Sequence, residues 1–411
     1  MHISKRLKRG SLILAAVVLG GLALMTIVSA FIYSPAYLYR AVVNGESKTT
    51  DYLLFPERKL PKSETPYNYP EMLDETILEQ PLEWEAGGET ISGDLQTLVE
   101  GTNTTSLLII QDDQLVLEYY SVGRGQYSIN TSFSMAKSVT SLLIGLAIEE
   151  GYIESEEQSI ADYIVEFRGT EMADISIADL LLMRSPIYYE EGGPFWFGHD
   201  TYTYYMPDIR SLALGHTRVT DKYRGRFHYN NYHPQYLGII LERATGQSVT
   251  DFMAAHLWGK LGPEYEASWS LDSEDTGFEK MESGINFRSI DFIKLGSMVL
   301  HNGQWNGEQI MDAGWLERSM QPVPYDPEEY QGTFLQDTGV CYGYMWYSLP
   351  NSLGGIDVFA WGKYGQFLYI SPENNTVILR TGSSDGGVDS YGDVDNWPQI
   401  LSELSERTGE R

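Results

Sequence analysis

Strand-like stretches lie toward both ends of this 411-residue chain, and helix-like stretches occupy the middle. Residues 106–120 (SLLIIQDDQLVLEYY) form two apolar, β-prone runs around Asp112-Asp113, the pattern of a β-hairpin. After residue 340, strand patterns return in YGYMWYSL, IDVFAW, QFLYIS and NTVILRTG, and a last helix is expected at about 396–406. We therefore expect both ends of the chain to share one sheet, with a helical region inserted between them.

The inserted region, about 135–280, contains helical patterns such as ISIADLLLMR, HPQYLGIILERATG and SVTDFMAAHLWGKLG. Its first helix is expected to run from Ser134 to Glu150 and to stop at Gly151. The predicted fold class is α+β: an antiparallel sheet flanked by helices and joined to an inserted all-helical region, within one domain over 91–408. Ser134 should lie at the junction of the two parts.

The N-terminal part has a different character. Residues 1–10 are basic, and the uncharged apolar run of 11–32 has the length of a bilayer span. We interpret it as an uncleaved transmembrane anchor, with a cleaved signal peptide as the alternative. Because basic flanks stay in the cytoplasm, the rest of the chain should lie outside a bacterial inner membrane, in the periplasm or at the cell exterior. Residues 33–90, rich in Pro and Tyr, are expected to form a stalk and lead-in segment.

Charge and cysteine content exclude several classes of function. The net charge is −29, which opposes nucleic-acid binding and disfavours anionic substrates at long range. The single cysteine, Cys341, excludes an intrachain disulfide and a cysteine-based zinc site. The seven histidines show no ligand-pair spacing. We expect no metal and no other cofactor, and the sequence does not indicate an oligomeric state.

The stretch TSFSMAKSVTSLLIGLAIEEG places Ser134 and Lys137 one helical turn apart. A lysine desolvated among packed helices has a lowered pKa and can take the proton of a serine hydroxyl. A serine at a helix N-terminus also lies close to free N–H groups. The pattern is short, so a capping serine beside a solvated lysine is the alternative interpretation.

Two further motifs bear on that choice. RFHYNNYHPQ places Tyr229 and Asn231 at the start of a helix, and WGKYGQF places Lys363-Tyr364-Gly365 between two strand patterns. In order and spacing, the three motifs resemble those of the serine β-lactamase and penicillin-binding-protein superfamily. The similarity spans about 50–405 and is greatest to the branch of class C β-lactamases, family VIII esterases and 6-aminohexanoate-dimer hydrolases.

The resemblance implies roles for the matching residues. Ser134 would be the acylated nucleophile and Lys137 its proton acceptor, while Tyr229 would move the proton to the leaving group and later activate water. Asn231 would orient the substrate or Lys137. Lys363 would hold Tyr229 as an anion or bind substrate.

The resemblance also implies an oxyanion hole. It would consist of the backbone N–H groups of Ser134 and of Gln366, the residue after Gly365. The sequence departs from the lactamases at Tyr364, where they carry a small hydroxyl residue, and this departure puts lactam specificity in doubt. The aromatic loop of 187–207 lies where that branch has its pocket rim, so it would either line the pocket or form an Ω-like loop that packs on itself.

We therefore expect a membrane-anchored serine hydrolase that acts through an acyl-enzyme on an ester or amide bond of a small, fairly apolar molecule. A β-lactamase or a D-amino-acid peptidase acting on peptidoglycan-type substrates is one alternative. A catalytically silent binding module of the same fold is another.

Overall fold

A computed structural model describes residues 12–24, 27–28, 34–192, 198–321, 328–385 and 394–409 of the chain. The predicted basic segment of 1–10 lies outside these residues, as does part of the apolar run of 11–32. No helix within the described residues is both long enough and apolar enough to cross a membrane.

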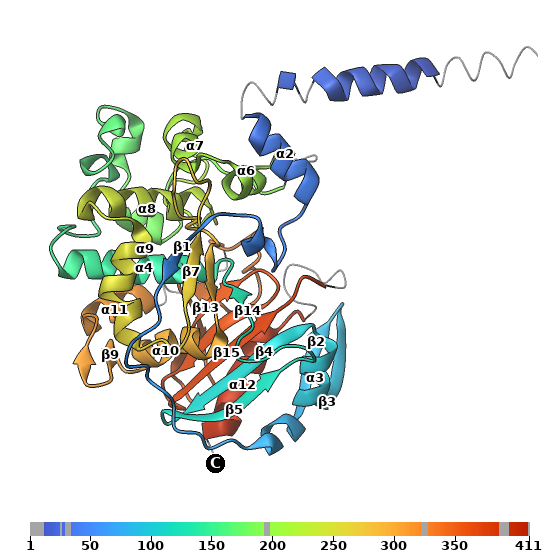
Figure 1. Ribbon diagram of the computed structural model, residues 1–411, viewed down its shortest axis with the longest axis vertical. Coiled ribbons are helices and arrows are strands. Elements are labelled where there is room, and N and C mark those ends of the chain that lie inside the picture. The colour runs from blue at the N-terminus through green and yellow to red at the C-terminus, as the bar shows by residue number, and fades with distance from the viewer. Residues whose placement is uncertain are drawn as a thin grey trace, which may run out of the picture.

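The main sheet has seven antiparallel strands in the order β11-β12-β13-β14-β15-β4-β5 (Figure 1). Strand β15 pairs with β4, so the two ends of the chain share this sheet, as predicted. The hairpin is also confirmed: Asp112 and Asp113 have φ values of 49° and 61°, which a tight two-residue turn requires. The strands are β4 (Thr104–Gln111), β5 (Gln114–Tyr120), β11 (Cys341–Tyr342), β12 (Tyr347–Pro350), β13 (Ile356–Gly362), β14 (Gln366–Ser371) and β15 (Thr376–Gly382).

Helices α10 (Ser289–Leu300) and α12 (Trp397–Gly409) cover opposite faces of this sheet. Gly296 of α10 lies against Leu368 and Val377, whereas the Arg380 guanidinium lies 4.2 Å from the ring centre of Trp397 in α12. Val377 and Arg380 point to opposite faces because side chains alternate along a strand. The sheet is therefore the middle layer of three.

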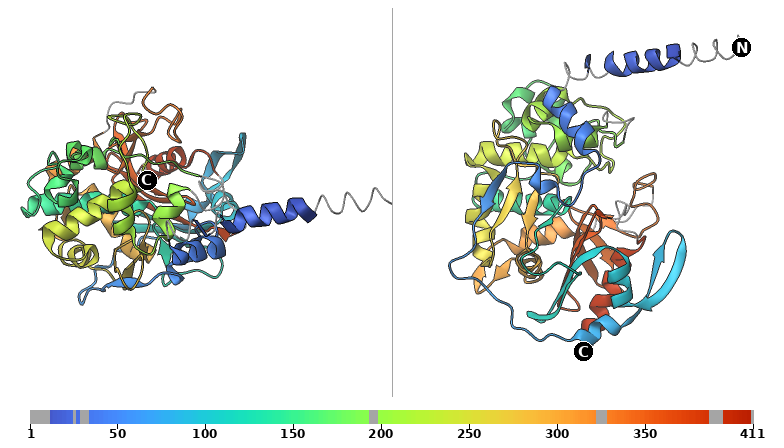
Figure 2. Two further views of the ribbon diagram at one scale, coloured as in Figure 1. Left: turned by 90° about the horizontal axis from the view of Figure 1, so that it is seen from above. Right: turned by 45° about the vertical axis from the view of Figure 1, so that its right-hand side comes forward.

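The helical region packs beside these layers (Figures 1 and 2). Its first helix, α4, begins and ends where the sequence predicts. The helices are α4 (Met135–Glu149), α5 (Ile177–Leu181), α6 (His199–Tyr205), α7 (Ile209–His216), α8 (Tyr232–Thr245), α9 (Val249–His256) and α11 (Ala313–Met320). Short 3₁₀ turns occur in the described part of the chain at Asp51–Leu53, Glu75–Glu79, Ile160–Asp162, Val165–Phe167, Glu171–Asp174 and Trp258–Leu261.

The prediction of an all-helical insertion was wrong in one respect. A second sheet of four short strands, in the order β1-β7-β8-β6, lies next to the helices. Its members come from distant parts of the chain and are two to four residues long, so no local alternation of apolar residues marks them. The strands are β1 (Glu57–Leu60), β6 (Asn130–Thr131), β7 (Ala267–Ser270) and β8 (Ile285–Phe287).

More regular structure lies in residues 34–90 than the sequence analysis expects. Helix α2 (Pro35–Asn44) packs on α6, with Tyr37 fully buried against Tyr202. Strand β1 pairs with β7. The remaining elements are the hairpin β2 (Pro81–Ala86) and β3 (Glu89–Asp94), helix α3 (Leu95–Gly101), and the short pair β9 (Gln304–Trp305) and β10 (Glu308–Gln309).

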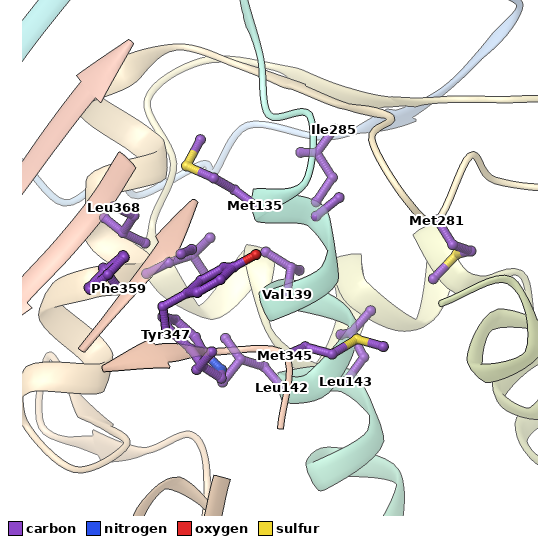
Figure 3. Packing of buried hydrophobic residues seen from close by; sticks show 14 of the residues in the cluster. Met135, Val139, Leu142, Leu143, Met281, Ile285, Met345, Tyr347, Phe359 and Leu368 are labelled. Carbon is purple, nitrogen blue, oxygen red and sulfur yellow. The ribbon is translucent and has the colours of Figure 1, made fainter. Parts of the chain in front are cut away.

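Helix α4 runs through the core between the main sheet and the helical region. It packs against both α8 and β13. Figure 3 shows Met135 and Val139 of this helix among side chains such as Tyr347, Phe359 and Ile285. Because nearly every residue of α4 is buried, its first turn, which carries the Ser-x-x-Lys pair, is held in a fixed position.

Candidate active site

Ser134 and Lys137 are in direct contact. The Lys137 Nζ atom donates to Ser134 Oγ at 2.8 Å and to the backbone carbonyl of Glu282 at 3.1 Å. Lys137 is only 2% exposed, and the Ser134 side chain makes no capping hydrogen bond to the helix it precedes. The alternative of a capping serine beside a solvated lysine does not fit this geometry.

The residue before the nucleophile adopts a rare backbone conformation. Phe133 has a φ of 43°, which is uncommon for a residue that carries a side chain. It is buried, and its ring meets that of Tyr364 edge-on at 5.5 Å. Ser132 supports the turn, because its Oγ donates to the Phe133 carbonyl and accepts from the backbone N–H of Ile285. Surrounding packing can hold a strained residue in place, and here it fixes the turn that leads into Ser134 at the start of the helix.

Tyr229 lies on the other side of the lysine. The Lys137 Nζ atom is 4.9 Å from the centre of the Tyr229 ring, which itself packs edge-on against Phe334 and Tyr342. Burial raises the pKa of Tyr347 well above its ordinary value, and the neighbouring Tyr229 raises it further. The hydroxyls of Tyr229 and Tyr347, beside the Lys137 amine, are groups that could pass on a proton.

Asn231 is the residue before α8 and presents one free acceptor. Its Nδ2 donates to the hydroxyl of Tyr189 at 2.9 Å, while its buried Oδ1 has no hydrogen-bond partner among the described residues. A buried unsatisfied amide oxygen is costly, so a ligand N–H could satisfy it.

The third motif lies between two strands, as predicted, but its side chains turn to other partners. Lys363, Tyr364 and Gly365 form the turn between β13 and β14, where Gly362 pairs with Gln366. The Lys363 Nζ atom pairs with Glu46 Oε1 at 2.8 Å and donates to Ser47 Oγ at 3.1 Å; its contacts are with the lead-in segment.

Gly365 and Gln366 do not line the cavity that holds the other predicted residues, which corrects the predicted oxyanion hole. The fully buried Gln366 side chain instead donates to the carbonyl of Gly382. Tyr364 does not crowd the pocket either, because it is buried and its hydroxyl donates to the Ser47 carbonyl at 2.7 Å.

Gly362 takes the place that the sequence analysis gave to Gly365. A Cβ atom at this position would lie 2.4 Å from the Ser132 carbonyl oxygen and 3.1 Å from the Ser134 nitrogen. Only glycine allows β13 to approach the nucleophile so closely. The sequence analysis chose the glycine three residues later in the chain. Both glycines lie between the same two strand-like runs, and the sequence does not show which one touches Ser134.

A cavity of about 750 Å³ collects the remaining predicted residues: Ser134, Lys137, Tyr229, Asn231 and Lys363 all line it. The described part of the aromatic loop contributes as expected; residues 193–197 of that loop lie outside the described residues. The other lining residues are Ala41, Val42, Gly45, Glu46, Ser47, Phe133, Glu191, Gly192, Asp200, Thr201, Tyr204, Tyr205, Glu282, Ser283, Phe334, Tyr347, Trp361 and Gly362.

The charge of the cavity wall is acidic. Desolvation raises the pKa of Glu191, and nearby Asp200 raises it further, while Lys137 and Lys363 lower it. Of the residues that line the described cavity, these two lysines are the only cations, and both already have partners. The wall is therefore better suited to neutral or cationic groups than to anions.

Several contributors were absent from the sequence analysis, among them Gly362, the Glu282 carbonyl that holds Lys137, and the lead-in residues 41–47. The last two come together only through long-range folding, which leaves no local signal. The described residues contain no group of three or more His, Cys, Asp or Glu side chains that could hold a metal ion.

Comparisons with known proteins agree with this geometry. The family model described as "Beta-lactamase" matches residues 91–395. A 6-aminohexanoate-dimer hydrolase from Paenarthrobacter ureafaciens is 25% identical over 304 residues, which cover 71% of this chain and 75% of that protein.

Solved structures share the fold. One, a protein from Bacillus anthracis provisionally assigned as a 6-aminohexanoate-dimer hydrolase, has a TM-score of 0.74 at 20% identity, covering 89% of this chain and 93% of that one. A class C β-lactamase has a TM-score of 0.56 at 14% identity, covering 76% and 94%. The resemblance drawn from the three motifs is confirmed: the chain belongs to the β-lactamase family and is a serine hydrolase of that family.

Proposed function

We propose that this enzyme hydrolyses an amide or ester bond of a small, fairly apolar molecule through an acyl group on Ser134. The observation that carries the proposal is the contact at 2.8 Å between Ser134 Oγ and the buried Lys137 Nζ at the wall of a large cavity. The retained nucleophile and base argue against a catalytically silent binding module.

In the proposed reaction, neutral Lys137 takes the proton of the Ser134 hydroxyl as Oγ attacks the substrate carbonyl. The bond to the leaving group then breaks, and the leaving amine or alkoxide receives a proton through Tyr229. A water molecule, deprotonated by the same groups, attacks the acyl carbon and releases the acid. Each proton moves between groups that line one cavity.

The oxyanion that forms in both steps needs backbone donors. We assign them to the N–H groups of Ser134 and Lys363, because Gly362 places the start of the β13–β14 turn against the nucleophile. Such donors typically contribute about 3 kcal/mol each to lowering the barrier. In this assignment Lys363 acts through its backbone, while its side chain is bound to Glu46.

The substrate is proposed to be a neutral amide or ester. Aromatic side chains such as Phe334, Tyr347 and Trp361 line the cavity. Of its two lysines, Lys363 is paired with Glu46, and Lys137 is bound to the Ser134 hydroxyl and a backbone carbonyl. An antibiotic carboxylate would find no free cation among the described lining residues. Amide hydrolysis is favoured by the relative from Paenarthrobacter ureafaciens, whose name gives a 6-aminohexanoate dimer as its substrate. A lactamase remains the second candidate, because Lys363 could exchange Glu46 for a ligand carboxylate.

We further propose that residues 11–32 anchor the enzyme in the inner membrane of a bacterium, with the catalytic domain outside the cytoplasm. The basic residues before this run support the orientation. Among the described residues of the run, Leu12, Val17 and Leu24 are more than half exposed, as expected of side chains that face lipid.

The experiment compares kcat/KM of one full-length preparation for p-nitrophenyl butyrate, the linear 6-aminohexanoate dimer and nitrocefin. We expect hydrolysis of the ester and of the linear dimer to exceed that of nitrocefin, and Ser134→Ala to abolish all turnover. Ser141→Ala is the matched control, since Ser141 lies in the same helix and its hydroxyl has no partner among the described residues. A larger value for nitrocefin would assign the enzyme to the lactamases.

A further inference from the structure

Helix α2 exposes an apolar face in a strongly acidic protein. Tyr39 is 68% exposed and Val43 is 60% exposed, and Ala36 and Val42 share this side of the helix. Leu54 adjoins it across a shallow groove of about 260 Å³. We call these five residues the α2 face.

The opposite side of α2 is fixed to the body of the enzyme. Tyr37 is fully buried, and Leu38 and Ala41 are each 6% exposed. Arg40 lines the groove itself, and its guanidinium donates to the Asp272 carbonyl at 2.6 Å. The helix therefore has apolar side chains toward the body of the enzyme and also toward the outside, where Arg40 and Asn44 are its polar members, whereas a surface helix normally turns mostly polar residues to water. None of the groove residues is acidic, although the chain carries 57 acidic against 28 basic residues. An exposed apolar surface of this kind is suited to an apolar binding partner.

The apolar segment that precedes α2 in the chain indicates a lipid surface as this partner. Residues 29–34 alone separate the α2 face from residues 12–24 and 27–28, whose large apolar side chains are also exposed. Figures 1 and 2 show the helix of residues 12–24 and α2 on the same side of the molecule. A second copy of this chain is a poorer cover, because two surfaces of net charge −29 repel each other.

The same helix also forms part of the catalytic cavity. Ala41 and Val42 line that cavity with Gly45, while Val42 belongs to the α2 face as well. The wall of the cavity and the α2 face therefore meet at Val42 on one helix. A molecule that leaves the lipid at α2 would enter beside Glu46 and the Ser134 site.

We propose that the α2 face docks on a lipid bilayer and that the cavity beside it takes its ester or amide substrates from that bilayer. This inference rests on the proposed function and narrows its substrate class to amphiphiles with an apolar chain. Interfacial helices of this kind lie in the membrane plane with their apolar side chains among the acyl chains.

The test places nitroxide labels on the full-length chain in phosphatidylcholine vesicles. Tyr39→Cys and Val43→Cys carry the label; Leu353→Cys is the control, because it is 60% exposed but adjoins the end of β13 opposite Gly362. The native Cys341 is buried and should not react. We expect the α2 labels to be relaxed by oxygen and protected from a polar nickel chelate, and the control label to show the reverse.

Two outcomes overturn the proposal. Labels on α2 as accessible to the nickel chelate as the control would place the face in water. Labels protected from both reagents would mean that a second copy or the chain's own apolar segment covers it.

A kinetic arm tests delivery of substrate. In the double variant Tyr39→Glu/Val43→Glu, hydrolysis of a long-chain p-nitrophenyl ester embedded in vesicles should fall about tenfold, while that of dissolved p-nitrophenyl acetate stays unchanged. Leu353→Glu should change neither. Equal effects on both esters would contradict delivery from the bilayer. If the unaltered enzyme does not hydrolyse p-nitrophenyl acetate, the proposed function is refuted. The label experiment would then still report whether the α2 face lies in the bilayer.

Discussion

A buried lysine needs partners, and those of Lys137 explain its position. Its Nζ atom contacts one hydroxyl and one carbonyl, Ser134 and Glu282, and forms no ion pair with a carboxylate of the described residues. The amine is therefore in direct hydrogen-bond reach of the serine hydroxyl. Lys363 contrasts with it, because its Nζ atom forms an ion pair with Glu46.

The contrast predicts different outcomes for the same substitution. Lys137→Met should lower kcat for p-nitrophenyl butyrate by at least about 10²-fold, the scale of a lost acid–base group. Lys363→Met should change it by less than about threefold, because its side chain is bound to the lead-in segment and only its backbone N–H faces the reaction. Equal losses of kcat in the two variants, measured by steady-state kinetics, would mean that the Lys363 side chain takes part in catalysis.

A buried histidine near the site predicts a pH effect on stability. Burial lowers the pKa of His233 from 6.5 to about 3, and its Nε2 atom lies 2.6 Å from Ser185 Oγ. Between these pH values the unfolded chain binds a proton there that the folded chain does not. The free energy of unfolding should therefore fall as the pH drops from about 6.5 to 3, by on the order of 4 kcal/mol from this residue.

Urea unfolding of the unaltered enzyme and of His233→Asn, followed at several pH values, checks this. The variant is less stable throughout, but its stability should decline less steeply over the same pH window. Parallel curves would mean that His233 does not titrate differently in the two states.

At the scale of elements, the close approach of β13 to the start of α4 builds the site. Gly362 of β13 lies against Ser132 and Ser134 at the point where the strand meets the helix. Neither element can shift easily, because α4 is buried along its length and β13 pairs with strands on both sides. The turn after Gly362 thereby acquires its place beside the nucleophile.

Gly362→Ala should disturb catalysis more than stability. The added methyl group meets backbone atoms that cannot rotate away, so we expect a cost of about 1–3 kcal/mol and a loss of activity of at least about tenfold. Gly215→Ala is the control: it sits in α7 with open space around it and should be neutral or slightly stabilising. Thermal unfolding and ester hydrolysis, measured on both variants, separate the two effects; full activity in Gly362→Ala would remove the basis for the proposed oxyanion hole.

The elements differed in how well the sequence predicted them. The hairpin at Asp112 and the helix after Ser134 carry strong local patterns, and both were predicted correctly. Strands β1 and β7 were missed, because their pairing joins residues about two hundred positions apart. The Lys363 turn was placed in the correct hairpin, but the contact of Gly362 with Ser134 depends on how two distant elements pack.

At the scale of the whole molecule, the pairing of β15 with β4 joins the two ends of the chain in one sheet beside the inserted helices. Residues of all three motifs line one cavity. The wall formed by residues 41–47 lies outside the span of 91–395 that matches the family model. The family therefore accounts for the nucleophile and its base, while part of the substrate pocket belongs to the lead-in segment of this chain.

The central claim is that Ser134 becomes acylated with the help of Lys137. A fluorophosphonate probe, which reacts covalently with activated serines, tests it on the full-length protein by peptide mapping in a mass spectrometer. We predict a single labelled residue, Ser134, with no label in Ser134→Ala and labelling slowed by at least about 10²-fold in Lys137→Ala. Label on another residue, or undiminished labelling of Ser134→Ala, would contradict the account.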